Sequence, residues 1–221
     1  MLDLQIKAKI VRIPKPNFEA SRLYSYIVTA DTGFAPSVSA NGCVLACCKI
    51  DTRRVCRVGD WVMGTTGANY GTGRLIYLMR VDDDESFAKY FADVRFQDHP
   101  DRIHKPNPLG YELVPNVYHN EKDGKDDRKT DRVLIALKDF AYFGKNAPRI
   151  PKHLRRFICQ HRKHRRFDGG FEALTKWAFS KGRGIMGVPH SPKFQRTELV
   201  SLGASNVQQQ NAKNRRKGIN A

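Results

Sequence analysis

The sequence predicts an α+β fold: a small, partly closed β barrel of mostly antiparallel strands, with peripheral helices and a basic helical extension towards the C-terminus. Short strand patterns follow one another between residues 4 and 81, and Gly59-Asp60 gives a tight-turn signal between two of them. Most helical patterns come after residue 81. With 40% hydrophobic and 10% aromatic residues, a chain of 221 residues can bury the core of one domain.

Five segments carry strand patterns. Apolar and polar residues alternate in the first, and β-branched and aromatic residues favour strands in the others. The segments are residues 4–10, 23–30, 61–66, 74–81 and 133–137. An apolar segment at 43–50 is expected to be buried. Residues 34–42, which contain Pro36 and Gly42, are expected to form a surface loop.

Helices are predicted in four places. A short helix over 50–58 would present three basic residues, Arg53, Arg54 and Arg57. The acidic run 82–85 suits the start of a second helix, because carboxylates stabilise the positive end of a helix dipole. Apolar residues recur at helical spacing after it, at Phe87, Tyr90, Phe91 and Val94. Two more helices are expected over residues 151–164 and 171–179.

The domain organisation follows from these patterns. Residues 1–203 are expected to form a single α+β domain. Within it, residues 98–131 form a loop insertion rich in Pro, Asn, Asp and Lys, and residues 145–203 form the basic helical part. Residues 204–221 are rich in Asn, Gln, Lys and Arg and are expected to form a flexible tail.

The positive charge is concentrated in the last third of the chain. The formal net charge is +17; residues 1–144 hold 21 basic and 19 acidic residues, whereas residues 145–221 hold 18 and 3. A one-sided basic field concentrates polyanions and accelerates their association. We therefore expect a nucleic-acid partner, DNA in preference to RNA. The alternative is a solvated basic face without a partner.

The five cysteines do not predict a disulfide framework, because their number is odd and no secretory signal is visible. Cys159, His161 and His164 are arranged as C-x-H-x-x-H, but no second pair stands at a customary zinc spacing. We therefore expect no metal. No nucleotide-sugar, methyl-donor or dinucleotide fingerprint appears either, so no cofactor is expected.

No membrane partner is expected, and the protein is predicted to be cytoplasmic. The longest apolar run, around residues 42–48, is far too short to cross a bilayer. The first thirteen residues lack the basic region, apolar stretch and cleavage site of a secretory signal. The sequence does not predict the oligomeric state.

Three polar clusters are candidates for a base or nucleotide pocket. The first follows a strand, the second is rich in glycine, and the third places aromatic residues before the basic run. Carboxylates accept hydrogen bonds from base edges, and aromatic rings stack on bases. The alternative is ordinary turns and core anchors. The candidate residues are Asp31, Thr32, Gly33, Asp60, Trp61, Thr65, Thr66, Tyr70, Asp139, Tyr142 and Asn146.

The basic run supplies the candidate phosphate-binding residues. Between residues 145 and 167 there are nine Lys and Arg residues and no acidic residue. Lys and Arg neutralise phosphates without reading the base sequence. The candidates are Lys145, Arg149, Arg155, Arg156, Arg162, Lys163, Arg165 and Arg166.

Motifs along residues 20–190 resemble known families. The order of motifs is Y-x-Y-x-V, D-x-G-x-x-P, C-x-L-A-C-C-K-I, G-D-W-V-x-G and Y-F-G-x-x-A-P-x-I-P. It is similar to the second class of nucleotide-modification-associated domains. The resemblance implies a link to modified nucleotides in DNA or RNA, often in phage, plasmid or other mobile-element conflicts, and it assigns no catalytic residue. The turn and strand at 59–62, with the following loop and strand, also resemble barrels of the PUA/EVE type.

Three functions compete. The first is a nucleic-acid-binding protein that recognises a modified base in a polar and aromatic pocket, while a basic surface holds the phosphate backbone. The second is an enzyme that makes, processes or removes modified nucleotides. Its acid–base groups would be Asp31 with Asp60 or Asp139, and its fallback nucleophiles or bases would be Cys43, Cys47 and His190. The third is a structural role, in which the basic third contacts an acidic protein.

Overall fold

The computed structural model describes residues 20–161 and 163–192, and it contains two mixed or antiparallel sheets and one separate hairpin. The predicted strand at 4–10, the tail at 204–221 and Arg162 lie outside the described residues. The larger sheet has the order β11-β1-β4-β5-β10-β12. Its strands are β1 (Arg22–Val28), β4 (Trp61–Thr66), β5 (Leu75–Arg80), β10 (Phe140–Tyr142), β11 (Arg165–Asp168) and β12 (Gly184–Ile185).

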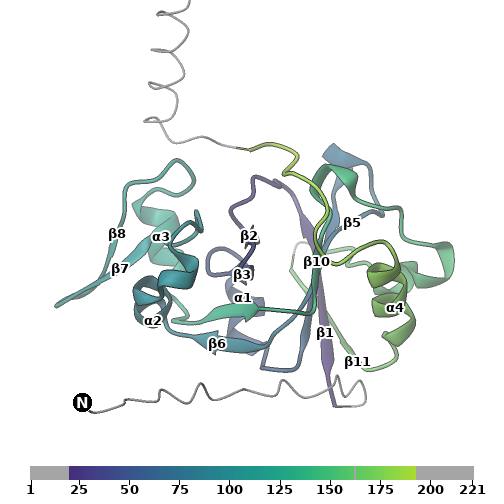
Figure 1. Cartoon of the computed structure of the whole chain (residues 1–221), viewed down its shortest axis with the longest axis horizontal. Helices are drawn as coiled ribbons and strands as arrows, with labels where there is room; N and C mark the ends of the chain where they lie inside the picture. The colour runs from purple at the N-terminus through teal and green to yellow at the C-terminus, as the bar shows by residue number, and fades with distance from the viewer. Residues whose placement is uncertain (1–19, 162, 193–221) are drawn as a thin grey trace, which may run out of the picture.

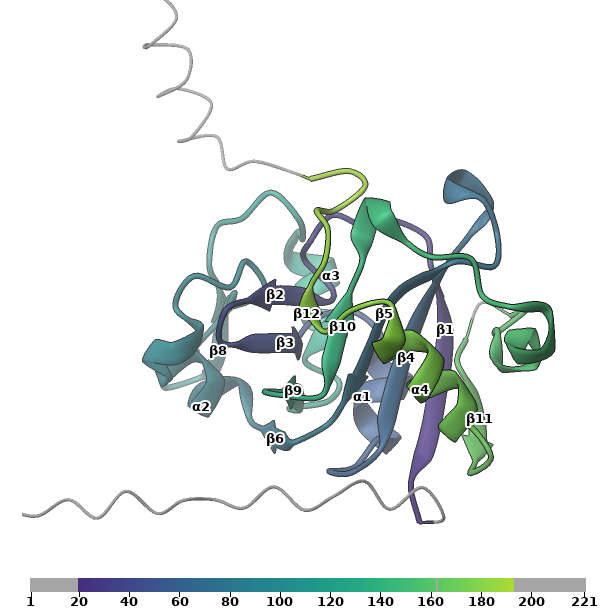
Figure 2. The ribbon, with the colours of Figure 1, turned by 45° about the vertical axis from the view of Figure 1, so that its right-hand side comes forward.

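The smaller sheet has the order β2-β3-β9-β6 and packs on the larger one (Figure 1, Figure 2). Its strands are β2 (Ser37–Ser39), β3 (Gly42–Leu45), β9 (Val133–Ala136) and β6 (Asp83–Glu85). Because successive side chains of a strand point to opposite faces, this sheet contributes side chains to two hydrophobic cores. Cys43, Leu45, Leu134 and Ala136 face the large sheet, whereas Val44, Val133 and Ile135 face a second cluster.

The helices are short and lie at the periphery. The α-helices are α1 (Ile50–Val55), α2 (Phe87–Ala92), α3 (Glu121–Asp127) and α4 (Glu172–Ser180). The 3₁₀ helices are η1 (Ala68–Tyr70), η2 (Val94–Phe96), η3 (Gly144–Asn146) and η4 (Lys152–Phe157). Leu174 and Ala178 of helix α4 and its N-cap residue Phe171 belong to the large core, where the Phe171 ring contacts Trp61 of β4. None of the described helices is long and apolar enough to cross a membrane.

The α+β class is confirmed, but the described strands do not close into a barrel. Strands β1 and β4 are parallel, and the two sheets do not pair with each other. The segment between β1 and β4 leaves the large sheet and forms β2, β3 and α1 before it returns. Local sequence patterns predict strands but not the pairing of strands that are far apart in the chain. The prediction of a partly closed barrel was therefore wrong.

Several element predictions were wrong. The acidic run does not open a helix: Asp83–Glu85 is the edge strand β6, which pairs with β9, and α2 starts after Ser86. Residues 34–42 contain β2, whose backbone pairs with β3. Arg53 of α1 is fully buried, because its guanidinium donates to backbone carbonyls of Asp127 and Arg132.

The basic helical extension is not found in the described residues. Only the 3₁₀ helix η4 forms in the segment 151–164, and the chain then extends into β11, which pairs antiparallel with β1. Pairing with an open sheet edge satisfies the backbone there in place of a helix. The helix predicted over 171–179 is confirmed as α4.

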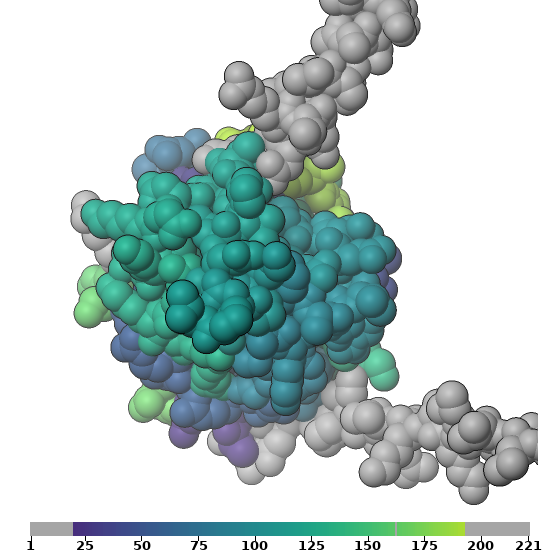
Figure 3. Space-filling view, turned by 90° about the vertical axis from the view of Figure 1, so that its left-hand side faces the viewer, coloured from purple at the N-terminus to yellow at the C-terminus, as the bar shows by residue number. Residues whose placement is uncertain are grey.

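The segment predicted as a loop insertion is structured. It forms the hairpin β7 (His104–Asn107) and β8 (Gly110–Leu113), and then helix α3. Asn120 caps α3 by accepting hydrogen bonds from the backbone N–H groups of Lys122 and Asp123. Tyr111, Leu113 and Tyr118 cover the second core. This segment therefore forms one end of the molecule (Figure 3).

Candidate functional site

A large pocket lies where the parallel strands β1 and β4 end side by side. Val28 of β1 pairs in register with Thr66 of β4, so the loops after both strands start at the same edge of the sheet. The pocket has a volume of about 570 Å³. It is lined by Ile27, Thr29, Thr66, Gly67, Ala68, Asn69, Thr72, Gly73, Arg149, Arg155, Ile158, Cys159 and Gln160. A cavity of this size matches ordinary small-molecule sites.

The loop after β4 is braced by Thr66. Its hydroxyl donates to the carbonyl of Gly71 at 2.5 Å and accepts from the backbone N–H of Arg74 at 3.1 Å. Thr65 is fully buried, and its hydroxyl donates to the carbonyl of Tyr26 at 3.3 Å. Of these two threonines only Thr66 lines the pocket, together with the exposed residues Asn69 and Thr72.

One wall of the pocket is cationic. Arg149 and Arg155 are exposed residues of this wall, and Arg155 is oriented by its Nε, which donates to the carbonyl of Ile150 at 3.1 Å. No acidic residue is among the described residues that line the pocket. The wall can therefore attract an anionic group such as a phosphate.

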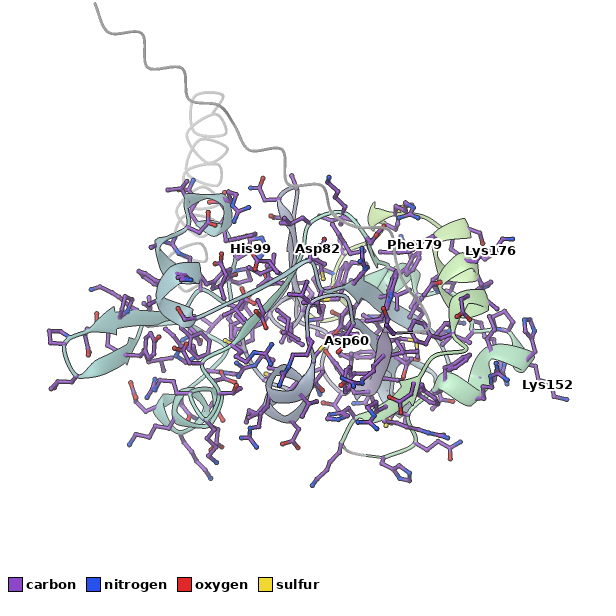
Figure 4. All side chains as sticks on the ribbon, turned by 90° about the horizontal axis from the view of Figure 1, so that it is seen from below. Asp60, Asp82, His99, Lys152, Lys176 and Phe179 are labelled. Carbon is purple, nitrogen blue, oxygen red and sulfur yellow. The ribbon has the colours of Figure 1, made fainter. Side chains whose placement is uncertain are left out.

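The other candidate phosphate-binding residues within the described ranges are also exposed: Lys145, Arg156, Lys163, Arg165 and Arg166. Arg165 and Arg166 lie on the edge strand β11, where Arg166 Nε lies 3.2 Å from an oxygen of Asp168. Figure 4 shows Lys152 of the preceding helix η4 pointing away from the body of the protein. The predicted basic run is thus a solvent-facing surface beside the pocket.

A second cluster surrounds Asp31, just after β1. Its carboxylate is buried and accepts from Tyr142 Oη at 2.6 Å, and it contacts His190 Nδ1 at 2.8 Å. The backbone N–H of His190 also donates to this carboxylate, and the hydroxyl of Tyr70 lies 3.3 Å from Ser191 Oγ. Burial and the neighbouring charge of Asp31 raise the pKa of Tyr142. Asp31, Tyr70 and Tyr142 are therefore brought together, and His190 joins them.

The Asp31 cluster fastens the segment 186–191 over the end of the sheet. Asn146 Nδ2 donates to the carbonyl of Met186 at 2.8 Å, and Gly33 lies against Pro189. Gly33 has φ of 79°, and a Cβ there would lie 2.7 Å from Cγ of Pro189. Thr32, which is half-buried, lines a smaller neighbouring pocket. The contacts of Asn146 and Gly33 are thus with this segment.

Asp60, Trp61 and Asp139 lie at the opposite end of the large sheet, so the candidates do not form one pocket. Trp61 pairs in register with Arg80, the last residue of β5. Asp60 accepts from the backbone N–H groups of Arg22 and Arg57, both at 2.9 Å, and acts as a turn residue. Asp139 Oδ1 lies 2.8 Å from a guanidinium nitrogen of Arg183.

The expected aromatic stacking surface is also missing from the described pocket lining. Trp61 and Tyr142 are buried in the core, and the Tyr70 ring lies 4.1 Å from the His190 ring, centroid to centroid. The pocket presents Ile27 and Ile158 instead. The sequence pattern that predicted stacking was aromatic residues next to glycines. In the structure these rings pack against other side chains of the protein, so they do not offer their faces to a base.

Among the fallback nucleophiles, Cys43 and Cys47 are fully buried, and burial raises the pKa of both thiols. Sequence reasoning missed Cys48, which is half-buried and lies 3.4 Å from Nε2 of His119. The two residues are separated by 71 positions, so no local spacing could have indicated the contact. In the C-x-H-x-x-H motif, the Cys159 thiol donates to the carbonyls of His161 and Lys163. His164 contacts the hydroxyl of Thr52.

The comparison with protein families agrees with the motifs. The family model for nucleotide modification associated domain 2 matches residues 20–196, which include both sheets, the pocket and the Asp31 cluster. No curated protein and no solved structure matches the chain. The match spans most of the chain, and we conclude that the protein belongs to the nucleotide modification associated domain 2 family.

Proposed function

We propose that the protein binds nucleic acid that carries a modified nucleotide and seats that nucleotide in the 570 Å³ pocket at the ends of β1 and β4. Membership of the family supports a role related to modified nucleotides. The observation that carries the proposal is a pocket with a cationic wall, Arg149 and Arg155, that continues into an exposed basic surface.

The lining suits a nucleotide chemically. Ile27 and Ile158 offer apolar surface to the faces of a base, and Asn69 and Gln160 offer donors and acceptors to its edges. A base in such a pocket is reached most readily when it is unpaired or extruded from a duplex. The guanidinium groups of Arg149 and Arg155 then contact the adjoining phosphates.

The basic surface would hold the backbone on either side, with DNA as the expected partner. Each phosphate neutralised on duplex DNA contributes about 0.9 to the slope of log affinity against log salt, so six contacts predict a slope of about −5. Fluorescence anisotropy at several salt concentrations measures this slope. The probes are hydroxymethylated and unmodified DNA and RNA, both single and double stranded.

The double variant Arg149→Gln, Arg155→Gln should weaken binding and reduce the salt slope by about 2, because two phosphate contacts are lost. The matched control also removes two charges: Lys176→Gln with Lys181→Gln, two exposed lysines on α4 and at its C-cap, away from the pocket lining. The pocket is the binding site if the double variant also loses the preference for the modified probe. A wild-type slope near zero, or equal behaviour of the double variant and the control, would contradict the proposal.

An enzyme that makes, processes or removes modified nucleotides is the second candidate. The contact between Cys48 and His119 favours it, because a thiol beside an imidazole is the usual pairing of a nucleophile with its base. The acidic groups expected for this function are not available in the described structure: Asp31 is buried in its own cluster, and Asp60 and Asp139 lie at the other end of the sheet.

A further inference from the structure

We propose that Cys48 is the nucleophile of an acyl-transfer site, with His119 as its base and Asp127 as the positioning residue. The inference does not depend on nucleotide binding in the larger pocket. All five cysteines lie in the described part of the chain, and Cys48 alone is not buried. Its Sγ lies 3.4 Å from Nε2 of His119, and Nδ1 of His119 lies 2.8 Å from Oδ2 of Asp127. This order of nucleophile, base and orienting carboxylate activates a weak nucleophile.

The backbone at Cys48 is held in a strained conformation. Cys48 has φ of 57° and Lys49 has φ of 42°, values that side-chain-bearing residues rarely adopt. The two residues form the turn between strand β3 and helix α1. Strained positions of this kind cluster at active sites, and a sharp turn between a strand and a helix exposes the nucleophile in several hydrolases.

Asp127 forms an ion pair with His119 and also holds this turn. Its Oδ1 accepts from the backbone N–H of Cys48 at 2.6 Å and lies 3.4 Å from the buried guanidinium of Arg53. Arg53 Nε in turn donates to the carbonyl of Cys48 at 2.8 Å. A buried ion pair therefore fixes both backbone groups of Cys48. Oδ2 of the same carboxylate faces Nδ1 of His119 at 2.8 Å and Nε2 of His104 at 3.6 Å.

A small pocket opens on this pair. Its volume is about 190 Å³, and Cys48, His119, Lys49 and Phe34 are among its lining residues. The His119 ring also meets the Phe34 ring edge-on, with centroids 4.7 Å apart. One water molecule needs about 10–15 Å³ of such space, so the pocket is large enough for a small acyl group.

The charge state suits the chemistry. Burial lowers the pKa of His119, but its contacts with Asp127 and Cys48 outweigh burial and raise that pKa to about 10. His119 is therefore protonated near neutral pH and can stabilise a thiolate at Cys48. A protonated imidazole beside the sulfur can also protonate a leaving alcohol or amine, which is what the cleavage of an ester or amide requires.

The proposed reaction balances without a further reactant except water. The Cys48 thiolate forms a bond to the carbonyl carbon, and the bond from that carbon to the leaving oxygen or nitrogen breaks. The leaving group takes the proton of His119 Nε2. Neutral His119 then removes a proton from water, whose oxygen attacks the thioester carbon. The C–S bond breaks, and a carboxylic acid and the thiolate are released.

A metal ion is the competing occupant of this region. Cys47, His119 and Asp127 can each offer a ligand atom, and within the described residues these atoms lie within 4.8 Å of one another. Three ligands fall short of the four usual in a structural zinc site, and the Arg53 guanidinium stands beside the carboxylate. Cys47 Sγ also contacts the carbonyl of Asp101 at 3.4 Å. The geometry therefore favours Cys48 as nucleophile over Cys47 as ligand.

Two probes of the full chain test the proposal. Iodoacetamide labelling, mapped by mass spectrometry, should modify Cys48 at about pH 6 at least about tenfold faster than in His119→Gln, because a free thiol with pKa about 8.5 is almost wholly protonated there. Incubation with p-nitrophenyl acetate should leave an acetyl thioester on Cys48. Cys48→Ser should show neither product, and Cys47→Ser should show both.

Each contrary result is informative. Equal labelling of the wild type and His119→Gln at about pH 6 would overturn the activation of Cys48. Absence of both the thioester and Cys48-dependent release of p-nitrophenol, despite fast labelling, would overturn the acyl-transfer step. Stoichiometric zinc in the purified chain, lost in Cys47→Ser, would make the cluster a metal site. Thermal unfolding confirms that each variant folds. Lys176→Gln, at an exposed position of α4, should change neither product. Nucleotide binding is measured separately by anisotropy, so failure of the nucleotide proposal is separately visible.

Discussion

At the residue scale, Asp127 and His119 form a partly buried ion pair with consequences for stability. Burial raises the pKa of the Asp127 carboxyl, but its contacts with His104, His119 and Arg53 outweigh burial and hold that pKa well below the usual range. The same contact between Asp127 and His119 also raises the pKa of His119. Because α3 supplies Asp127 and the turn before α1 supplies Cys48, these charges join the segment 104–127 to the smaller sheet.

The stability of the chain should depend on the titration of His119. Its folded pKa, about 10, is above the unfolded value of about 6.5, so protonation stabilises the folded state fully below about pH 6.5. This contribution is lost as the pH rises towards 10. The free energy of unfolding in urea, measured for the wild type and for His119→Gln, should differ most near pH 6 and converge at alkaline pH.

The control for this experiment is His153→Gln, which changes an exposed histidine of η4. Its difference from the wild type should stay small and constant over the same range of pH. A difference between wild type and His119→Gln that stays flat from about pH 6 to 10 would show that the ion pair does not raise the histidine pKa.

Residue types alone indicated part of the candidate site. Asp31, Tyr70 and Tyr142 were expected near one another and are in contact or close to it. The sequence could not indicate that the Asp31 carboxylate contacts Tyr142 and His190. These partners are 111 and 159 residues away, so they leave no local pattern. It also could not reveal that Arg53 is buried, since a basic residue in a short helix ordinarily faces water.

At the element scale, the predictable strands were those with strong patterns of their own. Strands β1, β4, β5 and β9 coincide closely with predicted segments, because their apolar and β-branched residues are buried on at least one face. The run 83–85 was unpredictable as a strand, because acidic residues have low strand propensity and only pairing with β9 holds them extended.

The close approach of the segment 186–191 to η3 depends on Gly144. It has φ of 50°, and a Cβ there would lie 2.1 Å from the carbonyl oxygen of Val188. Gly144→Ala should therefore lower the free energy of unfolding by about 1–3 kcal/mol more than Gly170→Ala. Gly170 is the matched control, because it also has a positive φ, 71°, but open space around its Cβ position.

Urea unfolding of both variants measures this difference. Equal losses would show that only the backbone conformation matters and that the segment moves aside at little cost. A larger loss at Gly144 would show that the segment 186–191 is an integral part of the fold, as its contacts with Asp31 and Asn146 indicate.

At the scale of the whole molecule, the position of the charge matters more than its amount. Arg155, Arg156, Arg165 and Arg166→Glu together lower the net charge of +17 by eight. The variant should lose most nucleic-acid affinity, because the exposed basic surface is reversed. A control with the same change in net charge, Lys89, Lys122, Lys125 and Lys138→Glu, replaces exposed lysines elsewhere and should bind much more tightly than the reversed variant.

Association rates by stopped-flow fluorescence and affinities by anisotropy distinguish the outcomes. Equal losses of affinity in both variants would show that the net charge alone attracts nucleic acid and that the basic surface is not a specific binding site. Unchanged nucleic-acid binding in the reversed variant would favour the remaining hypothesis, an acidic protein partner. The charge distribution was fully readable from the sequence, whereas the neighbouring pocket was not, since it depends on the parallel pairing of β1 with β4.

The pairing of β6 with β9 brings the two ends of the segment between residues 85 and 133 together. Glu85 and Val133 stand opposite each other, so the intervening residues leave and re-enter the sheet at nearly one point. A segment with adjacent ends can be exchanged while the sheet persists, provided that the replacement also covers Val44, Val133 and Ile135 of the second core. Since His119 and Asp127 belong to this segment and the residues of the 570 Å³ pocket do not, a chain with a different segment here would keep that pocket without the contact between Cys48 and His119.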